Sequence, residues 1–139
     1  MLQSDSECVL IHAGTPSIAR GLYSVFYTLQ EYGIKTSLLQ VDKYNDINES
    51  IDELKKLDNL ILLGISVHWV PQLAVSLKIA ELINSLYYAS KTKVVFGGIT
   101  TSFFAESLLK YQFIDYCIKG DGTKPIVELF NYLKNNTSS

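Results

Sequence analysis

The stretch that decides the fold is Asn59-Leu60-Ile61-Leu62-Leu63-Gly64-Ile65-Ser66, residues 59–66. Its apolar side chains follow one another without the alternation of a strand that has one face in water, so this strand is predicted to be buried on both faces. Strands of that kind occur in the middle of parallel sheets that helices cover on each side. We therefore expect residues 59–66 to form the central strand of such a sheet.

Outward from this strand, short apolar runs alternate with stretches of helical period, and Gly, Pro, Asn or Asp marks each exchange. The other predicted strands are residues 8–12, 35–41, 93–96 and 115–119. With right-handed crossovers, these units fit an α/β fold of the flavodoxin-like (Rossmann-like) kind, a doubly wound five-stranded parallel sheet of order 2-1-3-4-5. A barrel is excluded because it needs ~250 residues, whereas this chain has 139.

Apolar residues spaced three and four apart predict the inner faces of three helices. They are Ile18, Leu22, Val25, Phe26 and Leu29 before a left-handed cap at Gly33; Ile47, Ile51 and Leu54 in a short helix; and Leu73, Leu77, Ala80, Ile83 and Tyr87 after Pro71. The short helix is expected to begin at Asn48 or at a capping box of Ser50 and Glu53. Two more helices are predicted at residues 102–110 and 125–133, and residues 135–139 are expected to be a frayed tail.

The composition is that of one globular domain spanning residues 1–139. Lys and Arg number 12 and Asp and Glu number 14, so the net charge is −2. Without a basic block, binding to nucleic acid or to an anionic membrane is disfavoured. The N-terminus does not resemble a secretory signal, and the apolar stretch 60–67 is far shorter than the ~20 residues of a membrane span. We therefore expect a cytoplasmic protein.

The two cysteines, Cys8 and Cys117, are too few for a zinc site made of cysteine alone or for the usual ligation of an iron–sulfur cluster. Both lie inside apolar runs, where a free cysteine behaves as a small buried hydrophobe, and a disulfide is the lesser alternative. An iron–sulfur cluster would have to sit on another chain.

Ligands of such a sheet bind beyond the carboxyl ends of the strands. The loops at that edge are residues 12–17, 66–71, 97–102 and 120–123. The first contains Gly14 but lacks the glycine spacing of a dinucleotide fingerprint, so a plain turn explains it. The pair Gly97-Gly98 removes two β-carbons, which lets a flat ligand or a neighbouring helix approach the backbone, although a tight turn also accounts for it.

Polar candidates at this edge allow two interpretations each. His68 follows Ser66 and precedes Trp69; its imidazole can titrate or bind a metal, but no second ligand stands at metal spacing, so a hydrogen-bonded loop histidine is the alternative. Asp121 can accept a hydrogen bond from a ligand or stabilise the last helix by its charge, and Thr123 can cap that helix. No catalytic set emerges, because no hydroxyl stands in a nucleophile elbow and no histidine has a recognisable orienting partner. Whether the chain takes part in an enzyme stays open on these residues.

Several weak signals occur together in an order that resembles a known family. The runs are Gly21 to Gly33, Leu63-Gly64-Ile65-Ser66-Val67, Val94-Val95-Phe96-Gly97-Gly98-Ile99-Thr100, and Phe113 to Gly122. They look like the cobalamin (B12)-binding domain found N-terminally in class B radical S-adenosylmethionine enzymes, whose runs read approximately G-L-x-x-L-A-x-x-L-x-x-x-G, G-[IL]-S, V-x-x-G-G and D-x-x-x-x-G-E-G-E. The likeness covers nearly the whole chain.

The resemblance implies a corrinoid whose nucleotide tail descends beside the sheet, while the corrin lies over the first two loops. Glycines suit a bulky dimethylbenzimidazole and its ribose phosphate, because these approach strand ends only where side chains are missing. Bulky residues at Gly97 and Gly98 are therefore expected to abolish binding and leave the fold intact. The implied cofactor-binding residues are Gly14, Thr15, Pro16, Ser66, Val67, His68, Trp69, Gly97, Gly98, Ile99, Thr100, Gly120, Asp121 and Gly122.

The departures from the family pattern bear on the cobalt. The D-x-H-x-x-G motif, whose histidine binds cobalt from below in mutases and methionine synthase, is absent around both His12 and His68. Cobalt would then lack that ligand, as it commonly does in the radical enzymes, with His68 the one candidate near the ring. The final G-E-G-E appears as Gly120-Asp121-Gly122-Thr123.

The resemblance also implies a partner. The radical domain of the family carries a C-x-x-x-C-x-x-C cluster motif that this sequence lacks. The expected function is therefore a cobalamin-binding module that serves a radical S-adenosylmethionine domain or subunit, such as a methyltransferase, with cobalamin as cofactor and no iron–sulfur cluster of its own. The alternative is a cofactor-free domain that docks a partner protein through Tyr23, Tyr27, Tyr87 and Tyr88. The substrate and the oligomeric state cannot be derived from the residues.

Overall fold

The computed structural model describes residues 2–13, 20–41, 47–68, 70–87 and 92–136. Strands and helices alternate along it. The elements are β1 (Cys8–Ala13), α1 (Arg20–Glu31), β2 (Thr36–Val41), α2 (Ile47–Lys55), β3 (Leu62–Ser66), the short 3₁₀ helix η2 (Val70–Gln72), α3 (Leu73–Tyr87), β4 (Lys93–Gly97), α4 (Ile99–Leu108), β5 (Tyr116–Cys117) and α5 (Thr123–Asn136).

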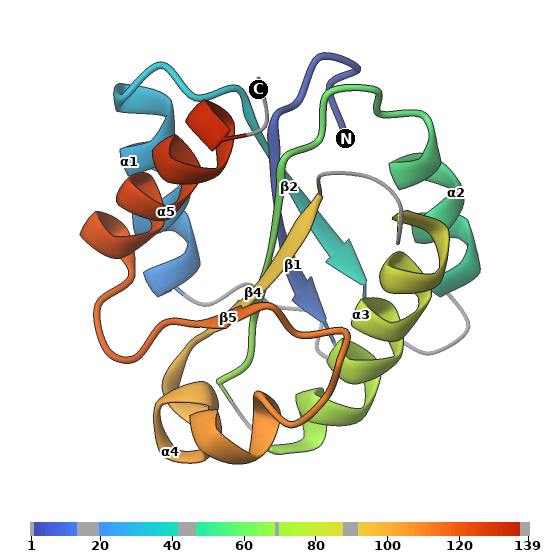
Figure 1. Cartoon of the computed structure of the whole chain (residues 1–139), viewed down its shortest axis with the longest axis vertical. Coiled ribbons are helices and arrows are strands. Elements are labelled where there is room, and N and C mark those ends of the chain that lie inside the picture. Colours follow the sequence, from blue (N-terminus) through green and yellow to red (C-terminus); the bar gives the residue numbers. More distant parts are fainter. Residues whose placement is uncertain (1, 14–19, 42–46, 69, 88–91, 137–139) are drawn as a thin grey trace.

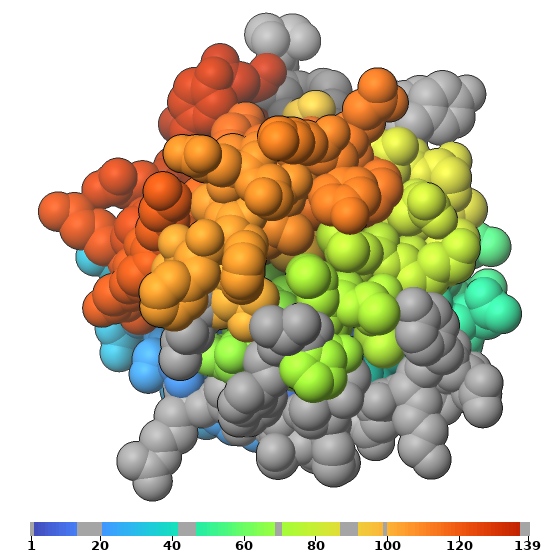
Figure 2. Space-filling model, turned by 90° about the horizontal axis from the view of Figure 1, so that it is seen from below, coloured from blue at the N-terminus to red at the C-terminus, as the bar shows by residue number. Residues whose placement is uncertain are grey.

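The strands form one parallel sheet of order β2-β1-β3-β4-β5, which confirms the predicted fold. Helices α1 and α5 cover one face, and α2 and α3 cover the other (Figure 1). Helix α4 lies below the carboxyl ends of the strands (Figure 1). In the view from below, α4 forms part of the surface at this end of the sheet (Figure 2). The register places Gly64 of β3 between Leu10 of β1 and Val95 of β4.

Strand β3 is buried along its whole length, as predicted for the central strand. Its side chains alternate between two cores. Leu63 and Ile65 pack with α2 and α3, whereas Leu62 packs with α1 and α5. The sequence segment was expected to be strand from residue 59, but the strand itself begins at Leu62.

Helix α3 buries Ala80 and Ile83 of the expected stripe but not the whole of it. Its buried side chains are Val75, Ser76, Ile79, Ala80 and Ile83, while the predicted Leu73 and Leu77 are only partly buried. Because α3 packs on α2 as well as on the sheet and carries apolar residues on more than one face, its periodicity does not select a single stripe. The side chain of Tyr87 lies outside the described part.

Two helix starts also differ from expectation. Helix α2 begins at Ile47, so neither Asn48 nor Ser50 caps it, and Ser50 instead faces inward with the predicted Ile47, Ile51 and Leu54. Helix α1 buries Leu22 and Leu29 as predicted and ends before Gly33, which takes the left-handed φ of 76°. Ile18 of the predicted stripe lies outside the described residues.

The last helix is longer than expected at both ends. Helix α5 runs from Thr123 to Asn136, so Asn135 and Asn136 of the expected tail are helical. Residues 137–139 lie outside the described part. Lys134, in its last turn, places Nζ 2.6 Å from Oε2 of Glu7, just before β1.

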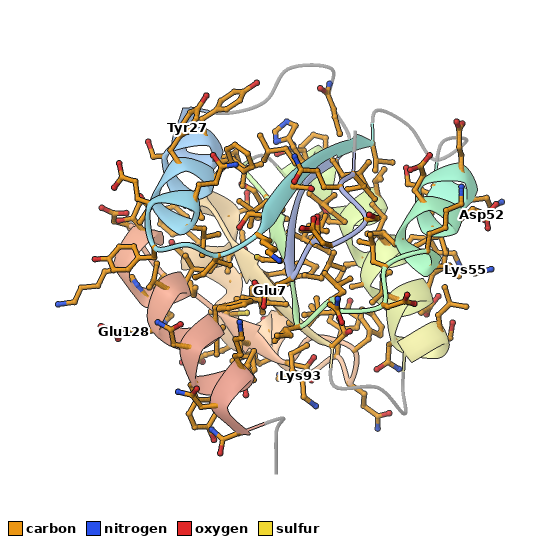
Figure 3. The ribbon with its side chains drawn as sticks, turned by 90° about the horizontal axis from the view of Figure 1, so that it is seen from above. Glu7, Tyr27, Asp52, Lys55, Lys93 and Glu128 are labelled. Carbon is orange, nitrogen blue, oxygen red and sulfur yellow. The ribbon has the colours of Figure 1, made fainter. Side chains whose placement is uncertain are left out.

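Charged and aromatic side chains cover the outer faces of the helices. Figure 3 shows Tyr27 projecting outward from α1, and Asp52 beside Lys55 on α2, where their charged groups are 3.6 Å apart. Exposed ion pairs of this kind contribute little to stability. No helix among the described residues is both long and apolar enough to cross a membrane.

Both cysteines are free: Cys8 is buried and Cys117 is half-buried. Burial raises the pKa of both thiols above the ordinary value. The expectation of free cysteines is confirmed, and the expectation that they are buried is confirmed for Cys8 and holds only in part for Cys117.

Candidate functional site

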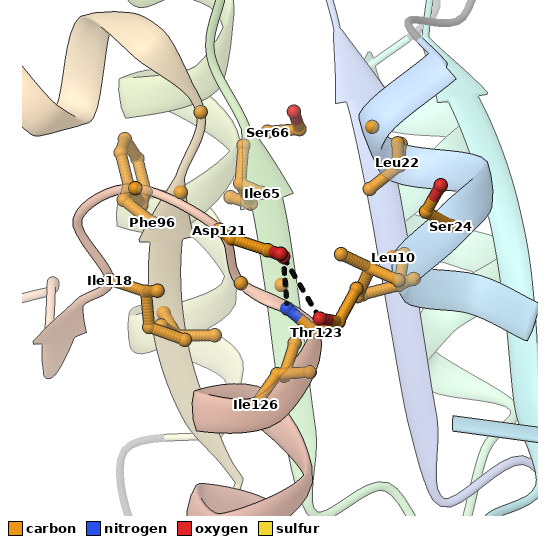
Figure 4. Close-up of a pocket in the computed structure, with 18 of the residues that line it drawn as sticks. Leu10, Leu22, Ser24, Ile65, Ser66, Phe96, Ile118, Asp121, Thr123 and Ile126 are labelled. Atoms are coloured by element: carbon orange, nitrogen blue, oxygen red, sulfur yellow. Dashed lines mark hydrogen bonds between the residues drawn. The ribbon is translucent and has the colours of Figure 1, made fainter. Parts of the chain in front are cut away.

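A pocket of about 500 Å³ lies between the sheet and the helix pair α1 and α5 (Figure 4). It runs from the carboxyl edge of the sheet down the face formed by β1, β3 and β4. Its lining residues are Leu10, Gly21, Leu22, Ser24, Val25, Gly64, Ile65, Ser66, His68, Val95, Phe96, Gly97, Gly98, Ile118, Gly120, Asp121, Gly122, Thr123 and Ile126. The pocket occupies the position at which doubly wound sheets bind ligands.

The structure brings part of the sequence-predicted site to this pocket. Of the residues predicted to bind the cofactor, those that line the pocket are Ser66, His68, Gly97, Gly98, Gly120, Asp121 and Gly122. Val67 and Thr100 are buried but do not line it. Ile99 is the first residue of α4, and its side chain lies outside the described part. Gly14, Thr15, Pro16 and Trp69 lie outside the described residues.

The deep part of the pocket is an apolar floor made of Leu10, Gly64, Val95 and Ile126. A Cβ on Gly64 would lie 2.8 Å from Leu10 Cδ2 and 3.7 Å from both Ile126 Cδ1 and Val95 Cγ1. Because β3 pairs with β1 and with β4, the backbone amide and carbonyl groups of Gly64 are used by the sheet ladder. The floor therefore presents hydrocarbon, and the missing side chain of Gly64 gives Leu10 its room.

The two glycines at the end of β4 have different reasons to be glycine. Gly98 has φ 99° and ψ 175°, a region that residues with a side chain rarely adopt. A Cβ there would lie 2.5 Å from the carbonyl oxygen of Val67. Gly97 has nothing within 4 Å of its Cβ position and no left-handed φ. The expectation that bulky residues at both positions leave the fold intact is therefore wrong for Gly98 and stays a prediction for Gly97.

The same turn explains why α4 begins at Ile99 and not at residue 102. Because Gly98 reverses the chain within one residue, the helix starts directly behind it. The hydroxyl of Thr101 donates to the carbonyl oxygen of Gly97 (2.9 Å), and that of Ser102 donates to the carbonyl oxygen of Gly98 (3.3 Å). Ser102 Oγ also accepts from the backbone N–H of Gly120 (2.9 Å), which joins the Gly97 turn to the next loop.

The Gly120 loop is organised by Asp121. Its Oδ1 accepts hydrogen bonds from the backbone N–H of Thr123 (3.0 Å) and from the Thr123 hydroxyl (2.9 Å), as Figure 4 shows. These bonds hold the pKa of Asp121 below its ordinary value. Asp121, and not Thr123 as expected, is thus the side chain that caps the start of α5. Gly120 takes a left-handed φ of 73°.

A buried amide ties the loop after β3 to the end of β1. The side-chain oxygen of Gln72 accepts from the backbone N–H of His68 (2.8 Å), and its Nε2 donates to the carbonyl oxygen of Ala13 (2.8 Å). Nε2 of Gln72 also lies 3.3 Å from Nε2 of His12. Both Gln72 and His12 are fully buried, which agrees with a structural role for His12.

His68 stands on the rim of the pocket. A Cβ on Gly21 of α1 would lie 4.0 Å from its Cε1 atom, so α1 approaches the ring closely. Partial burial lowers the pKa of His68, which favours the neutral imidazole. Among the described residues, no group of His, Cys, Asp and Glu is placed to hold a metal ion by protein ligands alone.

Sequence reasoning missed the floor and the buried amide. Gly64 carried a usable signal, because a glycine inside a strand often marks close approach of a ligand, but it entered only the predicted central strand and the family resemblance, not the predicted site. Leu10, Val95 and Ile126 are ordinary core residues in sequence, and only the tertiary arrangement shows that they face a cavity. Gln72 had no sequence signal, since its partners lie in two other segments.

Comparison with known proteins places this pocket in a family. Residues 6–130 match the B12 binding domain family. No curated protein matches the chain. The fold is also similar to those of solved structures that share low sequence identity with it.

One such structure is the radical S-adenosylmethionine methyltransferase TsrM from Kitasatospora setae, with a TM-score of 0.75 and 23% identity over 94% of this chain and 26% of that chain. Another is the cobalamin-dependent S-adenosylmethionine radical enzyme OxsB with aqua-cobalamin and S-adenosylmethionine bound, with a TM-score of 0.78 and 20% identity over 94% of this chain and 19% of that chain. A cobalamin-binding protein from Desulfitobacterium hafniense DCB-2 has a TM-score of 0.67 and 15% identity, over 88% of this chain and 58% of that chain.

The chain thus spans about a quarter of the length of TsrM and about a fifth of that of OxsB. The family match, from residue 6 to residue 130, covers the strands, the pocket and the helices except the last part of α5. The cofactor that gives this family its name is cobalamin. The chain therefore belongs to the B12-binding domain family.

Proposed function

We propose that this chain is a cobalamin-binding module that serves a radical S-adenosylmethionine methyltransferase or a related enzyme. The observation that carries the proposal is the glycine-lined pocket beside the sheet in a member of the B12-binding domain family. In the proposal, residues 1–139 act as one binding unit, and the radical chemistry belongs to another domain or another subunit. The bound cofactor would supply a cobalt centre that can carry a methyl group, and the protein would supply its position.

The residues present fit the nucleotide tail of cobalamin. A benzimidazole is flat and apolar, and the floor of Leu10, Gly64, Val95 and Ile126 offers a matching hydrocarbon surface. Ribose and phosphate need polar partners, and the hydroxyl of Ser66 lies nearer the carboxyl edge than Ile126 does (Figure 4). A mostly apolar pocket with a few polar groups toward one end is the usual composition of a small-molecule site.

The cobalt side of the proposal rests on the two histidines. His12 is fully buried in β1, its Nε2 lies beside the amide of Gln72, and it is not among the residues that line the pocket. We therefore propose that cobalamin binds without a histidine of the D-x-H-x-x-G type. His68 on the rim is the nearest imidazole to where the corrin would rest, and its lowered pKa keeps it in the neutral form.

A cofactor-free interaction module is the second candidate function. It is favoured by Tyr23 and Tyr27 on α1, which are exposed and whose ring centroids lie 6.5 Å apart in a stacked arrangement. The side chain of Tyr87 and all of Tyr88, which were also suggested for such a surface, lie outside the described residues. This candidate requires that the pocket bind no corrinoid, so one experiment separates the two.

The test is to mix the purified chain with hydroxocobalamin, desalt it and record the visible spectrum. The proposal expects near-stoichiometric corrinoid to be retained, and a colourless protein at micromolar concentration would contradict it. Gly97→Leu should abolish retention because its side chain enters open space in the lining. The matched control is Asn84→Leu, on the exposed face of α3 across the sheet, which should retain the cofactor as the unaltered chain does.

A further inference from the structure

Resting on the proposed function, we infer that the pocket selects corrinoids by their lower base, accepting an apolar benzimidazole and discriminating against a purine. In this proposal the lower base lies on the floor of the pocket, below the corrin at the carboxyl edge of the sheet.

The floor offers hydrocarbon. Leu10 and Val95 flank Gly64 across the two neighbouring strands, and Ile126 of α5 closes the space from above the sheet. Backbone groups of the middle strand are paired in the ladder on both sides. In the part of the chain that the structure describes, the atoms around Gly64 are therefore methyl and methylene groups.

The polar groups of the lining lie elsewhere or are already paired. Ser66 is two residues further along β3 than Gly64, roughly 6–7 Å toward the carboxyl edge at the rise of a strand. The carboxylate of Asp121 accepts both hydrogen bonds that Thr123 donates at the start of α5. Asp121 is exposed to solvent and therefore lies outside the buried floor. The Thr123 hydroxyl already gives its one proton to Asp121, so it has none to donate to a ring nitrogen of a purine.

A purine base needs what this floor lacks. Adenine carries an amino group and several ring nitrogens, whereas the edge of dimethylbenzimidazole that would point into the floor carries two methyl groups. Placing a polar group against hydrocarbon leaves it without a partner, and one such group weakens binding by about tenfold or more. The methyl groups lose nothing and gain contact with the floor. The structure therefore predicts a preference of at least about tenfold for the benzimidazole form.

The experiment compares three corrinoids by spectral titration of the full chain: hydroxocobalamin, its adenine-based counterpart pseudocobalamin, and cobinamide, which has no nucleotide. We expect hydroxocobalamin to bind most tightly and pseudocobalamin at least about tenfold more weakly. Equal affinity for hydroxocobalamin and pseudocobalamin overturns the inference and leaves the proposed function standing. If no corrinoid binds, the proposed function fails and the inference fails with it.

Substitutions at two neighbouring valines of β4 test whether the floor is the source of the preference for hydroxocobalamin over pseudocobalamin. Val95→Thr adds a hydroxyl to the floor at nearly constant volume and should narrow the difference between the two cobalamins. Val94→Thr makes the same change one residue earlier, where the side chain packs in the opposite core, and should leave the difference unchanged. If the preference is present but Val95→Thr does not narrow it, the floor is not its source and the assignment is overturned.

Discussion

The sharpest prediction concerns the turn at the end of β4, where Gly98→Ala should destabilise the fold although only one methyl group is added. The φ of 99° and ψ of 175° lie in a region that costs a residue with a Cβ roughly 1–3 kcal/mol. The added Cβ would stand 2.5 Å from the carbonyl oxygen of Val67, so that segment must also move.

Moving Val67 disturbs two hydrogen bonds. Its N–H donates to the carbonyl oxygen of Gly97 (2.9 Å), and its carbonyl oxygen accepts from the N–H of Thr100 (3.1 Å). At about 0.5–1.5 kcal/mol each, their loss brings the expected decrease in the free energy of unfolding to roughly 2–6 kcal/mol. That is a large part of the 5–15 kcal/mol or so that holds a typical domain together.

The assay is urea unfolding followed by circular dichroism, with Gly97→Ala as the matched control. Gly97 has open space around its Cβ position and an ordinary φ, so alanine there should change the free energy of unfolding by less than about 1 kcal/mol. The slope against urea should stay the same in both variants, which shows that the native state has changed and not the extent of unfolding. A Gly98→Ala protein as stable as the Gly97→Ala protein would refute the reasoning.

Three further predictions rest on other contacts. Gln72→Leu removes the side-chain partner of the His68 N–H and of the Ala13 carbonyl, so it should lower the free energy of unfolding by roughly 2–4 kcal/mol in the same assay; an unchanged midpoint would show that these groups find other partners. Burial lowers the pKa of His68 in the folded protein, so just below the ordinary value of 6.5 the unfolded chain binds more protons than the folded one. The contribution of this group to the free energy of unfolding is therefore complete above pH 6.5 and is lost as the pH falls below that value. The His68 ring should titrate with a midpoint below 6.5 by nuclear magnetic resonance, and a midpoint above that value contradicts the burial argument. A thiol reagent should modify half-buried Cys117 in the native protein but reach Cys8 only in denaturant, and rapid modification of both thiols would mean that β1 opens readily.

The order of the strands in the sheet was predictable because it follows from the hydrophobic periodicity of short segments, which can be read from the sequence alone. The apolar residues 60–63, which follow one another without alternation, indicated a central strand, and the alternation of strands and helices left few topologies. The exact first residue of α4 could not be predicted, because Thr101 and Ser102 are residue types that favour loops in sequence. In the structure their hydroxyls donate to the carbonyl oxygens of Gly97 and Gly98, which allows them to lie inside the helix.

The pocket was predictable at its edge but not at its depth. Glycines such as Gly97 and Gly120 stand at strand ends, where fold and sequence together indicate a ligand. Leu10 and Val95 have the same residue types as the closed core on the other side of the sheet, and whether such residues meet each other or a cavity depends on how far α1 and α5 stand from the sheet. The distance between these helices and the sheet depends on how all the layers pack together, so it cannot be predicted from the sequence of any one segment.

The ion pair between Glu7 and Lys134 also bears on how such a unit can be joined to others. It joins the side chain of Glu7, just before β1, to that of Lys134 in the last turn of α5, with Nζ 2.6 Å from Oε2. Both residues lie at the end of the sheet opposite to the carboxyl ends of the strands, where the pocket opens. A circular permutant that links these two positions and opens the chain elsewhere needs only a short connection, so the binding unit is modular in geometry as well as in sequence.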